Sequence, residues 1–201
     1  MEDRGGRREA RKLATRRALR EAASTLFAQH GVEATTVRQI AAAAGVTERT
    51  FYRYFAGKEE LIAGRAQEWI EALHDAVAER PAEEGPLSAV ERAMSALARE
   101  AGERGSEGVW LFGGAARPLL RVSARPLIRV ERAITSALLS RGGGSPAEEE
   151  RFQAELLARV AVAVLRTALL SHRRFGDEGE ASPGIEALIG AGFAALRGLA
   201  S

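Results

Sequence analysis

The chain has 201 residues, enough for a small helical unit and a larger core, and a formal net charge of only +2. It contains no cysteine, which excludes disulfide scaffolds and thiolate metal sites and favours a reducing compartment. The small net charge hides an asymmetry, because residues 1–58 carry twelve Lys or Arg against six Asp or Glu, whereas the other 143 residues carry 17 against 21. A basic amino-terminal part is typical of a protein that binds nucleic acid.

The amino terminus, residues 1–11, is rich in Gly and Arg and poor in apolar residues, so we expect it to be a basic arm that is disordered without DNA. Its basic side chains either reach a DNA backbone or minor groove or form a solvated tail. The arm is not a signal peptide, and the most apolar stretch, residues 160–165, is too short to span a bilayer. We therefore expect a cytoplasmic protein without membrane contact.

The segment from about residue 14 to residue 30 is predicted to be a helix with one buried face. Its apolar residues recur at i, i+3, i+4, i+7 and i+8, namely Leu19, Ala22, Ala23, Leu26 and Phe27. We expect this helix to support the elements that follow it.

A short helix is predicted next, from Val37 to the residues before Gly45. Thr36 and Gln39 have the spacing of a capping box, which satisfies free N–H groups at a helix start. Gly45 stands where the chain leaves the helix in a left-handed conformation, which glycine adopts without steric cost.

A second short helix follows, with Thr47 as its N-cap. At about 100° per residue, Phe51 and Phe55 point inward. The opposite arc carries Arg49, Thr50 and Arg53, with Tyr52 on its flank. Such side chains suit base edges and phosphates in the major groove, so the pair of helices is interpreted as a DNA-binding helix-turn-helix at about residues 35–54.

The stretch TTVRQIAAAAGVTERTFYRYFAGKEELI, preceded by LFAQHGVEA, resembles the DNA-binding domain of TetR-family transcriptional regulators. The resemblance covers roughly residues 12–72 and includes Phe27, Gly31, Gly45, the block from Tyr52 to Phe55, and Lys58. It implies a homodimeric bacterial regulator, usually a repressor, whose all-helical carboxy-terminal domain contains an inducer pocket and the dimer interface. Position 54 is often His in the family and is Tyr here, and Gly57 replaces a frequent polar cap.

The resemblance also implies residue roles in DNA binding. Phosphate contacts are expected from Thr36, Tyr52, Tyr54 and Lys58, and base or near-base contacts from Thr47, Glu48, Arg49, Thr50 and Arg53. Glu48 has two interpretations, because it either accepts from a cytosine amino group or stabilises a helix amino terminus as a first-turn anion.

The rest of the chain is predicted to be helical, which makes the fold all-α. A long helix runs from about Lys58 to Arg80 and joins the DNA-binding domain, residues 12–72, to a helical bundle for effector binding and dimerisation, residues 73–201. Loop signals divide the remainder into about five helices, and the segment RGGGSP at 141–146 is interpreted as a loop and not as a phosphate cradle.

The last two helices are apolar around much of their circumference and are expected to form an intersubunit four-helix bundle. The expected interface residues are Leu156, Val160, Val164, Ile185, Leu188, Phe193 and Leu196. Alternatively, these helices complete the core of one monomer.

An effector pocket is expected in the middle of the second domain. Its candidate lining residues are Trp110, Phe112, Arg117, Arg121 and Leu127, although aromatic residues at helical spacing are equally typical of a core. The three histidines lie in separate segments without a catalytic or metal-binding pattern, so neither an enzyme nor a metal or other cofactor is expected.

Together these features predict a dimeric transcriptional regulator, most simply a repressor that an unknown small molecule releases from a palindromic double-stranded DNA operator. One alternative is a ligand-independent activator or architectural DNA-binding protein. A more distant one is a small-molecule enzyme or carrier with an incidental helix-turn-helix.

Overall fold

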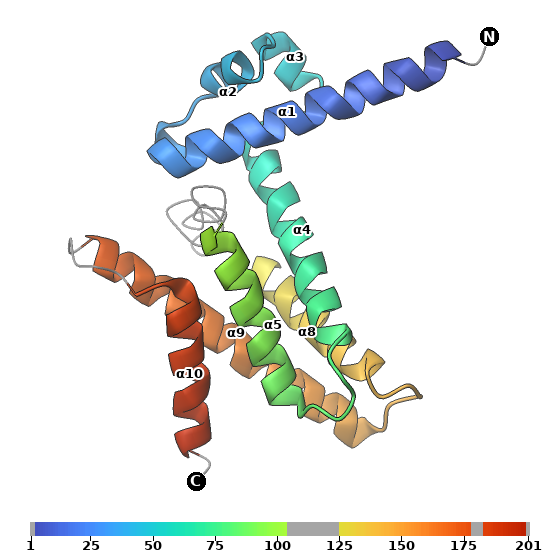
Figure 1. Cartoon of the computed structure of the whole chain (residues 1–201), viewed down its shortest axis with the longest axis vertical. Coiled ribbons are helices and arrows are strands. Elements are labelled where there is room, and N and C mark those ends of the chain that lie inside the picture. The colour runs from blue at the N-terminus through green and yellow to red at the C-terminus, as the bar shows by residue number, and fades with distance from the viewer. Residues whose placement is uncertain (1–2, 104–124, 178–182, 200–201) are drawn as a thin grey trace. The chain divides into compact units, whose positions relative to one another are not determined.

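The computed structural model describes residues 3–103, 125–177 and 183–199, and this part of the chain is all helical (Figure 1). The helices are α1 (Asp3–Ala34), α2 (Val37–Ala43), α3 (Glu48–Tyr52), α4 (Lys58–Ala78), α5 (Pro86–Glu103), α8 (Arg125–Ser140), α9 (Glu148–Asp177) and α10 (Ile185–Leu199). They divide into two compact units, Met1–Arg65 and Ala66–Ser201, and α4 contributes residues to both. The division lies earlier in α4 than the boundary expected after residue 72.

The amino-terminal unit contains α1, α2, α3 and the start of α4. Helix α1 packs on α2, and α2 packs on α3. The predicted apolar face of α1 is buried, with Leu19, Ala23 and Phe27 among the most buried residues of the unit. The helix breaks at Gly31, whose φ of 78° and ψ of 162° are not helical, so the last residues of α1 turn toward α2. The support helix expected at residues 14–30 is therefore present.

Helix α1 begins well before the support helix that we expect. The structure continues it back to Asp3, through most of the segment interpreted as a disordered arm, residues 1–11. One ion pair between successive turns supports this part, in which the ammonium of Lys12 lies 3.6 Å from the carboxylate of Glu9. In the structure, residues 3–11 of the expected arm are therefore part of a basic helix. That the arm is disordered in the absence of DNA stays a prediction.

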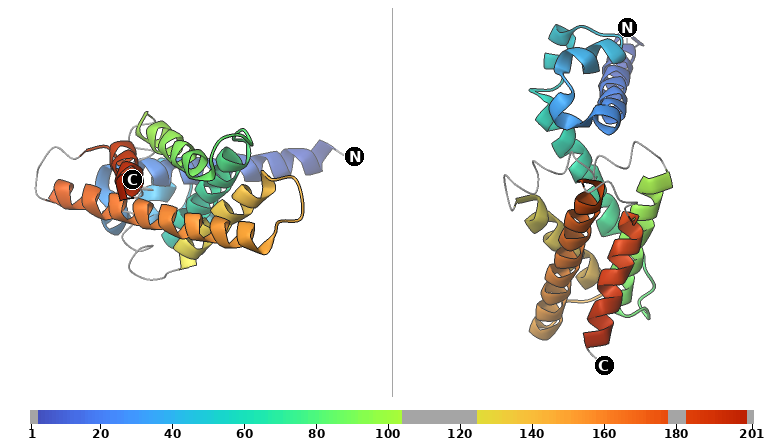
Figure 2. Two further views of the ribbon diagram at one scale, coloured as in Figure 1. Left: turned by 90° about the horizontal axis from the view of Figure 1, so that it is seen from below. Right: turned by 90° about the vertical axis from the view of Figure 1, so that its left-hand side faces the viewer.

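The carboxy-terminal unit is a helical bundle (Figure 2), and its buried side chains form a continuous apolar core. Helix α9 packs against α8 and α10, and α10 also packs against α5. The approach of α9 and α10 is close at Gly192, where a Cβ atom would lie only 2.7 Å from a methyl carbon of Val164. Two residues earlier in the chain, a Cβ atom at Gly190 would have no neighbouring atom within 4 Å. Gly192 therefore sets the spacing of these two helices.

The connection between α8 and α9 braces the connection between α4 and α5. The guanidinium of Arg141 donates to the carbonyl oxygens of Arg80 at 3.4 Å, Pro81 at 2.5 Å and Glu84 at 2.6 Å. Arg80 in turn binds the carboxylate of Glu84 at 2.5 Å, and this hydrogen bond lowers the pKa of Glu84. Arg141 opens the segment RGGGSP, whose residues lie between α8 and α9 as predicted.

Among the described helices, none has both the length and the apolar character that crossing a lipid bilayer requires.

Candidate DNA interface

Helix α2 is held at both ends by its own sequence. The Oγ1 atom of Thr36 accepts from the backbone N–H of Gln39 at 3.2 Å, and the Oε1 atom of Gln39 accepts from the N–H of Thr36 at 2.8 Å. The predicted capping box is thus confirmed. At the other end Gly45 has a φ of 68°, and the N–H of Val46 donates to the carbonyl of Ala41 at 2.9 Å. This arrangement is a Schellman motif, which stops α2 and directs the chain into α3.

Helix α3 is short and depends on its cap. The Oγ1 atom of Thr47 accepts from the backbone N–H of Thr50 at 3.2 Å, and the two hydroxyl oxygens lie 3.0 Å apart. Glu48 is exposed in the first turn, where a negative charge is favourable. Both threonines predicted to lie near bases therefore also stabilise the start of the helix. A hydroxyl can serve both roles, because its oxygen has two acceptor sites and its proton can rotate.

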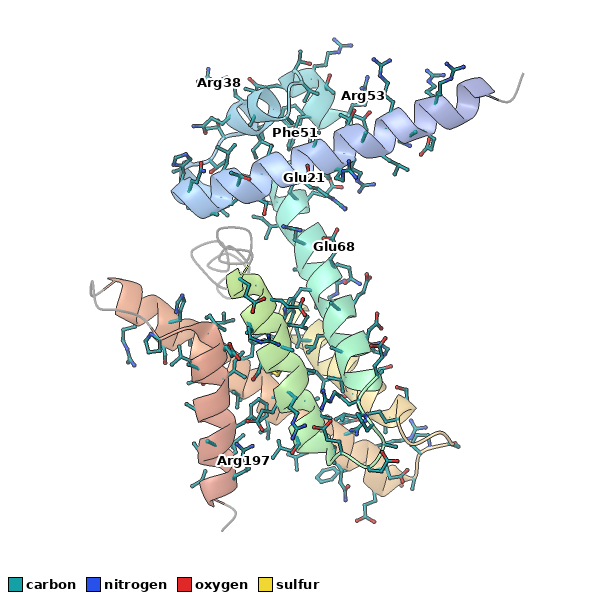
Figure 3. The ribbon with its side chains drawn as sticks, viewed as in Figure 1. Glu21, Arg38, Phe51, Arg53, Glu68 and Arg197 are labelled. Carbon is teal, nitrogen blue, oxygen red and sulfur yellow. The ribbon has the colours of Figure 1, made fainter. Side chains whose placement is uncertain are left out.

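The two faces of α3 differ in burial as predicted. Phe51 is 0% exposed and Phe55 3%, and their ring centroids lie 5.7 Å apart. Arg49 and Arg53 are exposed, and Tyr52, which meets the edge of the Phe51 ring, is 56% exposed. Figure 3 shows Phe51 between α3 and α1, with Arg53 at the outer surface of the unit. The inner aromatic face therefore anchors a polar and basic outer face.

Arg53 and Tyr54 form one structural group at the end of α3. The guanidinium of Arg53 lies 5.1 Å from the ring centroid of Tyr54 and donates to its hydroxyl at 3.5 Å. Such stacking orients the planar guanidinium and reduces the freedom it would lose on binding. Tyr54 is half-buried, so the Tyr that stands in place of the frequent His positions Arg53 here.

Lys58 has partners within the protein. Its ammonium donates to the carbonyl oxygen of Val32 at 2.6 Å and to that of Thr35 at 3.2 Å. Thr35 is 1% exposed, and its hydroxyl donates to the carbonyl of Gly31 at 2.7 Å. Lys58 at the start of α4 therefore stabilises the junction of α1 and α2. Two of its three N–H donors are used, which leaves one for the predicted phosphate contact.

We expect Lys58→Met to destabilise the amino-terminal unit by about 1–3 kcal/mol, because the change removes charged hydrogen bonds to two carbonyls while retaining an apolar stem. Hydrogen exchange of peptides from residues 3–65 measures this loss. If Lys58 contacted DNA alone, its substitution would lower the salt dependence of binding by about one phosphate contact and leave hydrogen exchange unchanged. Glu59→Gln, at an exposed neighbouring position, is the matched control.

Sequence reasoning missed two exposed residues of this unit, Arg16 and Arg38, and one buried residue, Thr35. Thr35 stabilises the junction of α1 and α2 through its hydroxyl, which donates to the carbonyl of Gly31. Its only sign in the sequence is its position four residues after Gly31. Arg38 is exposed on α2 at the outer surface of the unit (Figure 3). Arg16 on α1 lies with its guanidinium 5.4 Å from the ring centroid of Phe55. The contact of Arg16 joins segments far apart in the sequence, so no local pattern indicates it.

Of the candidate effector-pocket residues, only one can be placed. Trp110, Phe112, Arg117 and Arg121 lie outside the described residues. Leu127, on α8, is half-buried and packs against the core of the carboxy-terminal unit. The pocket stays a prediction.

The candidate dimer residues fall into two groups. Val164, Ile185 and Phe193 are buried within the chain's own core, because α9 and α10 pack closely against each other at Gly192. The other four, Leu156, Val160, Leu188 and Leu196, are exposed or half-buried. Helix α9 additionally exposes apolar side chains that the sequence did not single out, Phe152 at 65% and Leu170 at 47%, beside Leu156 at 49%. Positions 152, 156, 163 and 170 share one face of α9.

Comparison with known proteins identifies the amino-terminal unit. Residues 19–64 match the family model of bacterial regulatory proteins of the tetR family. The chain is 40% identical over 104 residues to the HTH-type transcriptional regulator TcmR of Streptomyces glaucescens, a match that covers 52% of this chain and 46% of TcmR. It is 48% identical over 44 residues to the repressor KstR2 of Mycobacterium tuberculosis, covering 22% of each protein. The matches thus span about half of one relative and less of the other.

Solved structures show the same fold over most of the chain. FadR of Thermus thermophilus, a TetR-family repressor in complex with lauroyl-CoA, superposes with a TM-score of 0.58 over 89% of this chain and 91% of FadR, at 18% identity. A TetR-family regulator from Streptomyces coelicolor gives a TM-score of 0.52 at 22% identity, covering 92% and 94%. Residues 19–64 therefore form a DNA-binding domain of the TetR family, and the described helices have the fold of TetR-family regulators.

Proposed function

We propose that this protein is a dimeric repressor that binds a palindromic DNA operator and is released by a small-molecule effector. The observation that carries the DNA-binding part is the outer face of α3, where Arg49 and Arg53 are exposed on a helix that Phe51 fixes from behind. An α-helix fits the major groove, and a guanidinium there binds guanine O6 and N7 with two hydrogen bonds. The preorganised Arg53 is suited to this role.

The proposed phosphate contacts surround this reading face. Thr36 and Lys58 stand at the amino-terminal ends of α2 and α4, and Tyr52 and Tyr54 flank Arg53. Hydroxyl and ammonium groups at such positions fix the register of a protein on DNA without reading sequence. Specificity is then assigned to Thr47, Glu48, Arg49, Thr50 and Arg53.

Dimerisation is proposed through the exposed apolar face of α9 together with α10. A row of apolar side chains that includes Phe152, Leu156 and Leu170 is more than scattered surface exposure, and a two-fold contact between two copies removes it from water. Two reading helices related by the two-fold axis then meet half-sites about 34–36 Å apart when these are one helical turn apart.

Repression and effector release are supported by the relatives. KstR2 and FadR are named as repressors, and FadR is solved with lauroyl-CoA. In the proposed mechanism an effector binds the carboxy-terminal unit and shifts α4. The first residues of α4 belong to the amino-terminal unit, so this shift changes the position of the helix-turn-helix.

The DNA-reading role is tested by Arg49→Ala. We expect the variant to lose about 1–3 kcal/mol of binding free energy on the best operator and to relax the preference at one base position. Binding-site selection from random duplexes, followed by titration of single-base variants, measures both effects. Arg17→Ala, an exposed arginine on α1, is the control. Equal loss on every sequence would assign Arg49 to the phosphate backbone instead.

A second candidate function is effector-independent DNA binding, as an activator or architectural protein. A metabolite panel that includes long-chain acyl-CoA, added to the preformed complex, separates the two. The repressor proposal expects release of the operator by one member of the panel, whereas persistent binding with stimulated transcription from the neighbouring promoter supports the alternative.

A further inference from the structure

The amino-terminal half of α1 extends beyond the part of the helix that packs. Leu19 is fully buried, and Arg16 contacts the ring of Phe55. In contrast, all residues from 6 to 14 are exposed, including the apolar side chain of Leu13 at 61%. At about 1.5 Å per residue, the stretch from Asp3 to Arg16 is a helical extension of roughly 20 Å. A segment so poor in buried contacts gains little of its stability from the core.

The charge of this extension is unfavourable for an isolated helix. Between residues 6 and 20 there are seven Lys or Arg and a single acidic residue, Glu9. Arg8, Lys12 and Arg16 follow one another at i, i+4 spacing, where like charges destabilise a helix. A polyanion bound along the helix removes this repulsion, and the condensed counterions that DNA releases add to the gain.

The basic side chains share a side with the helix-turn-helix. At 100° per residue, Arg8, Arg11 and Thr15 lie in line with the buried Leu19, within an arc of about 80°. In the amino-terminal half of α1, basic side chains stand on the side of the helix where α2 and α3 lie (Figure 3). Arg17, which pairs with Glu21 at 3.5 Å, lies on the far side of α1 by the same rotation.

We propose that the amino-terminal half of α1 binds the phosphate backbone of double-stranded DNA outside the half-site that α3 reads. This segment extends the DNA-binding surface of the protein as a helix, and it does not act as a flexible arm in the minor groove. This inference rests on the proposed DNA-binding function and adds a second, sequence-independent binding element. A span of roughly 20 Å corresponds to about six base pairs of flanking duplex.

The test uses Arg8→Gln and Arg11→Gln, singly and together, in the full-length chain, with Arg17→Gln as the matched control. Binding to a selected operator is measured between low and moderate salt, on a long duplex and on one trimmed by about six base pairs at each end. On the long duplex, each substitution removes one phosphate contact worth about 0.9 from each of the two copies, so it is expected to lower the slope of log K against log salt by about 1.8, and the double variant by about twice that. On the trimmed duplex, wild type and double variant are expected to bind alike.

Three other outcomes overturn the proposal. A double variant with the wild-type slope on the long duplex shows that the extension does not contact flanking DNA. An equal loss for Arg17→Gln shows that only total charge matters. A difference that persists on the trimmed duplex places the two arginines within the half-site. If the wild-type chain selects no specific sequence at all, the proposed function itself fails, which is a separate result.

Discussion

Replacing Leu156 with glutamate is expected to convert the protein into a monomer and to weaken its binding to a palindromic operator by about 10²–10⁴-fold. Leu156 is already 49% exposed in the single chain, so glutamate there costs the monomer little. In the proposed dimer two copies of α9 meet across a two-fold axis, so each glutamate enters an apolar contact and loses its hydration. Without the dimer, the second half-site no longer binds as an intramolecular event.

Sedimentation velocity at micromolar concentration and operator titration measure the two effects of Leu156→Glu. Ile128→Glu is the matched control, because Ile128 is an exposed apolar residue of α8, outside the proposed interface. The control is expected to remain dimeric. A Leu156→Glu variant that sediments as the wild type does would exclude this face of α9 from the interface, whatever its effect on DNA.

Phe51→Ala is expected to unfold the amino-terminal unit while the carboxy-terminal unit stays folded. Phe51 is fully buried and packs against Tyr52 and Phe55, and truncation of a buried phenylalanine costs about 3–5 kcal/mol. Such a loss is a large part of the stability of a unit this small. Hydrogen exchange should therefore become fast in peptides from residues 3–65 and remain slow in α9, and DNA binding should disappear.

The adjacent substitution Tyr52→Ala separates folding from binding. Tyr52 is 56% exposed, so its loss is expected to leave hydrogen exchange unchanged and to weaken DNA binding through the proposed phosphate contact. Protection that survives in Phe51→Ala would contradict the assignment of Phe51 as the anchor of α3.

The sequence predicts the helix-turn-helix well because its determinants are local. The capping box of Thr36 and Gln39, the left-handed Gly45 and the cap at Thr47 each act within a few residues, and the structure contains all three. The period of the apolar residues likewise predicts which face of α3 is buried. The all-helical fold is confirmed for the described residues, and the TetR-family DNA-binding domain is confirmed for residues 19–64.

Contacts between residues far apart in the chain could not be predicted from the sequence. The hydrogen bonds of Lys58 join it to residues more than twenty positions away, so its dual role is invisible in the motif. An apolar periodicity also cannot distinguish a helix face that meets the chain's own core from one that meets a second copy. For this reason the sequence places Val164 and Phe193 among the candidate interface residues although both are buried in the single chain, and it does not single out Phe152, which is exposed.

The helical extension of α1 shows a second limit of prediction from sequence, because composition alone does not indicate its structure. Its composition indicates disorder because it has little to bury, and charge repulsion opposes a helix. Continuity with the buried part of α1 removes the cost of helix nucleation, so the helix can propagate into a segment that would not form one alone. Whether this helix also binds DNA beside the half-site is the question that the flanking-duplex experiment answers.

In the proposed function two chains, each with one reading helix, bind one palindrome. The most direct measurement is the mass of the complex, by light scattering after size exclusion, on a selected operator and on the same duplex with one half-site scrambled. Two chains are expected on the intact palindrome, with a large loss of affinity on the scrambled duplex. One chain on each duplex, with equal affinity for both, would contradict the proposed function.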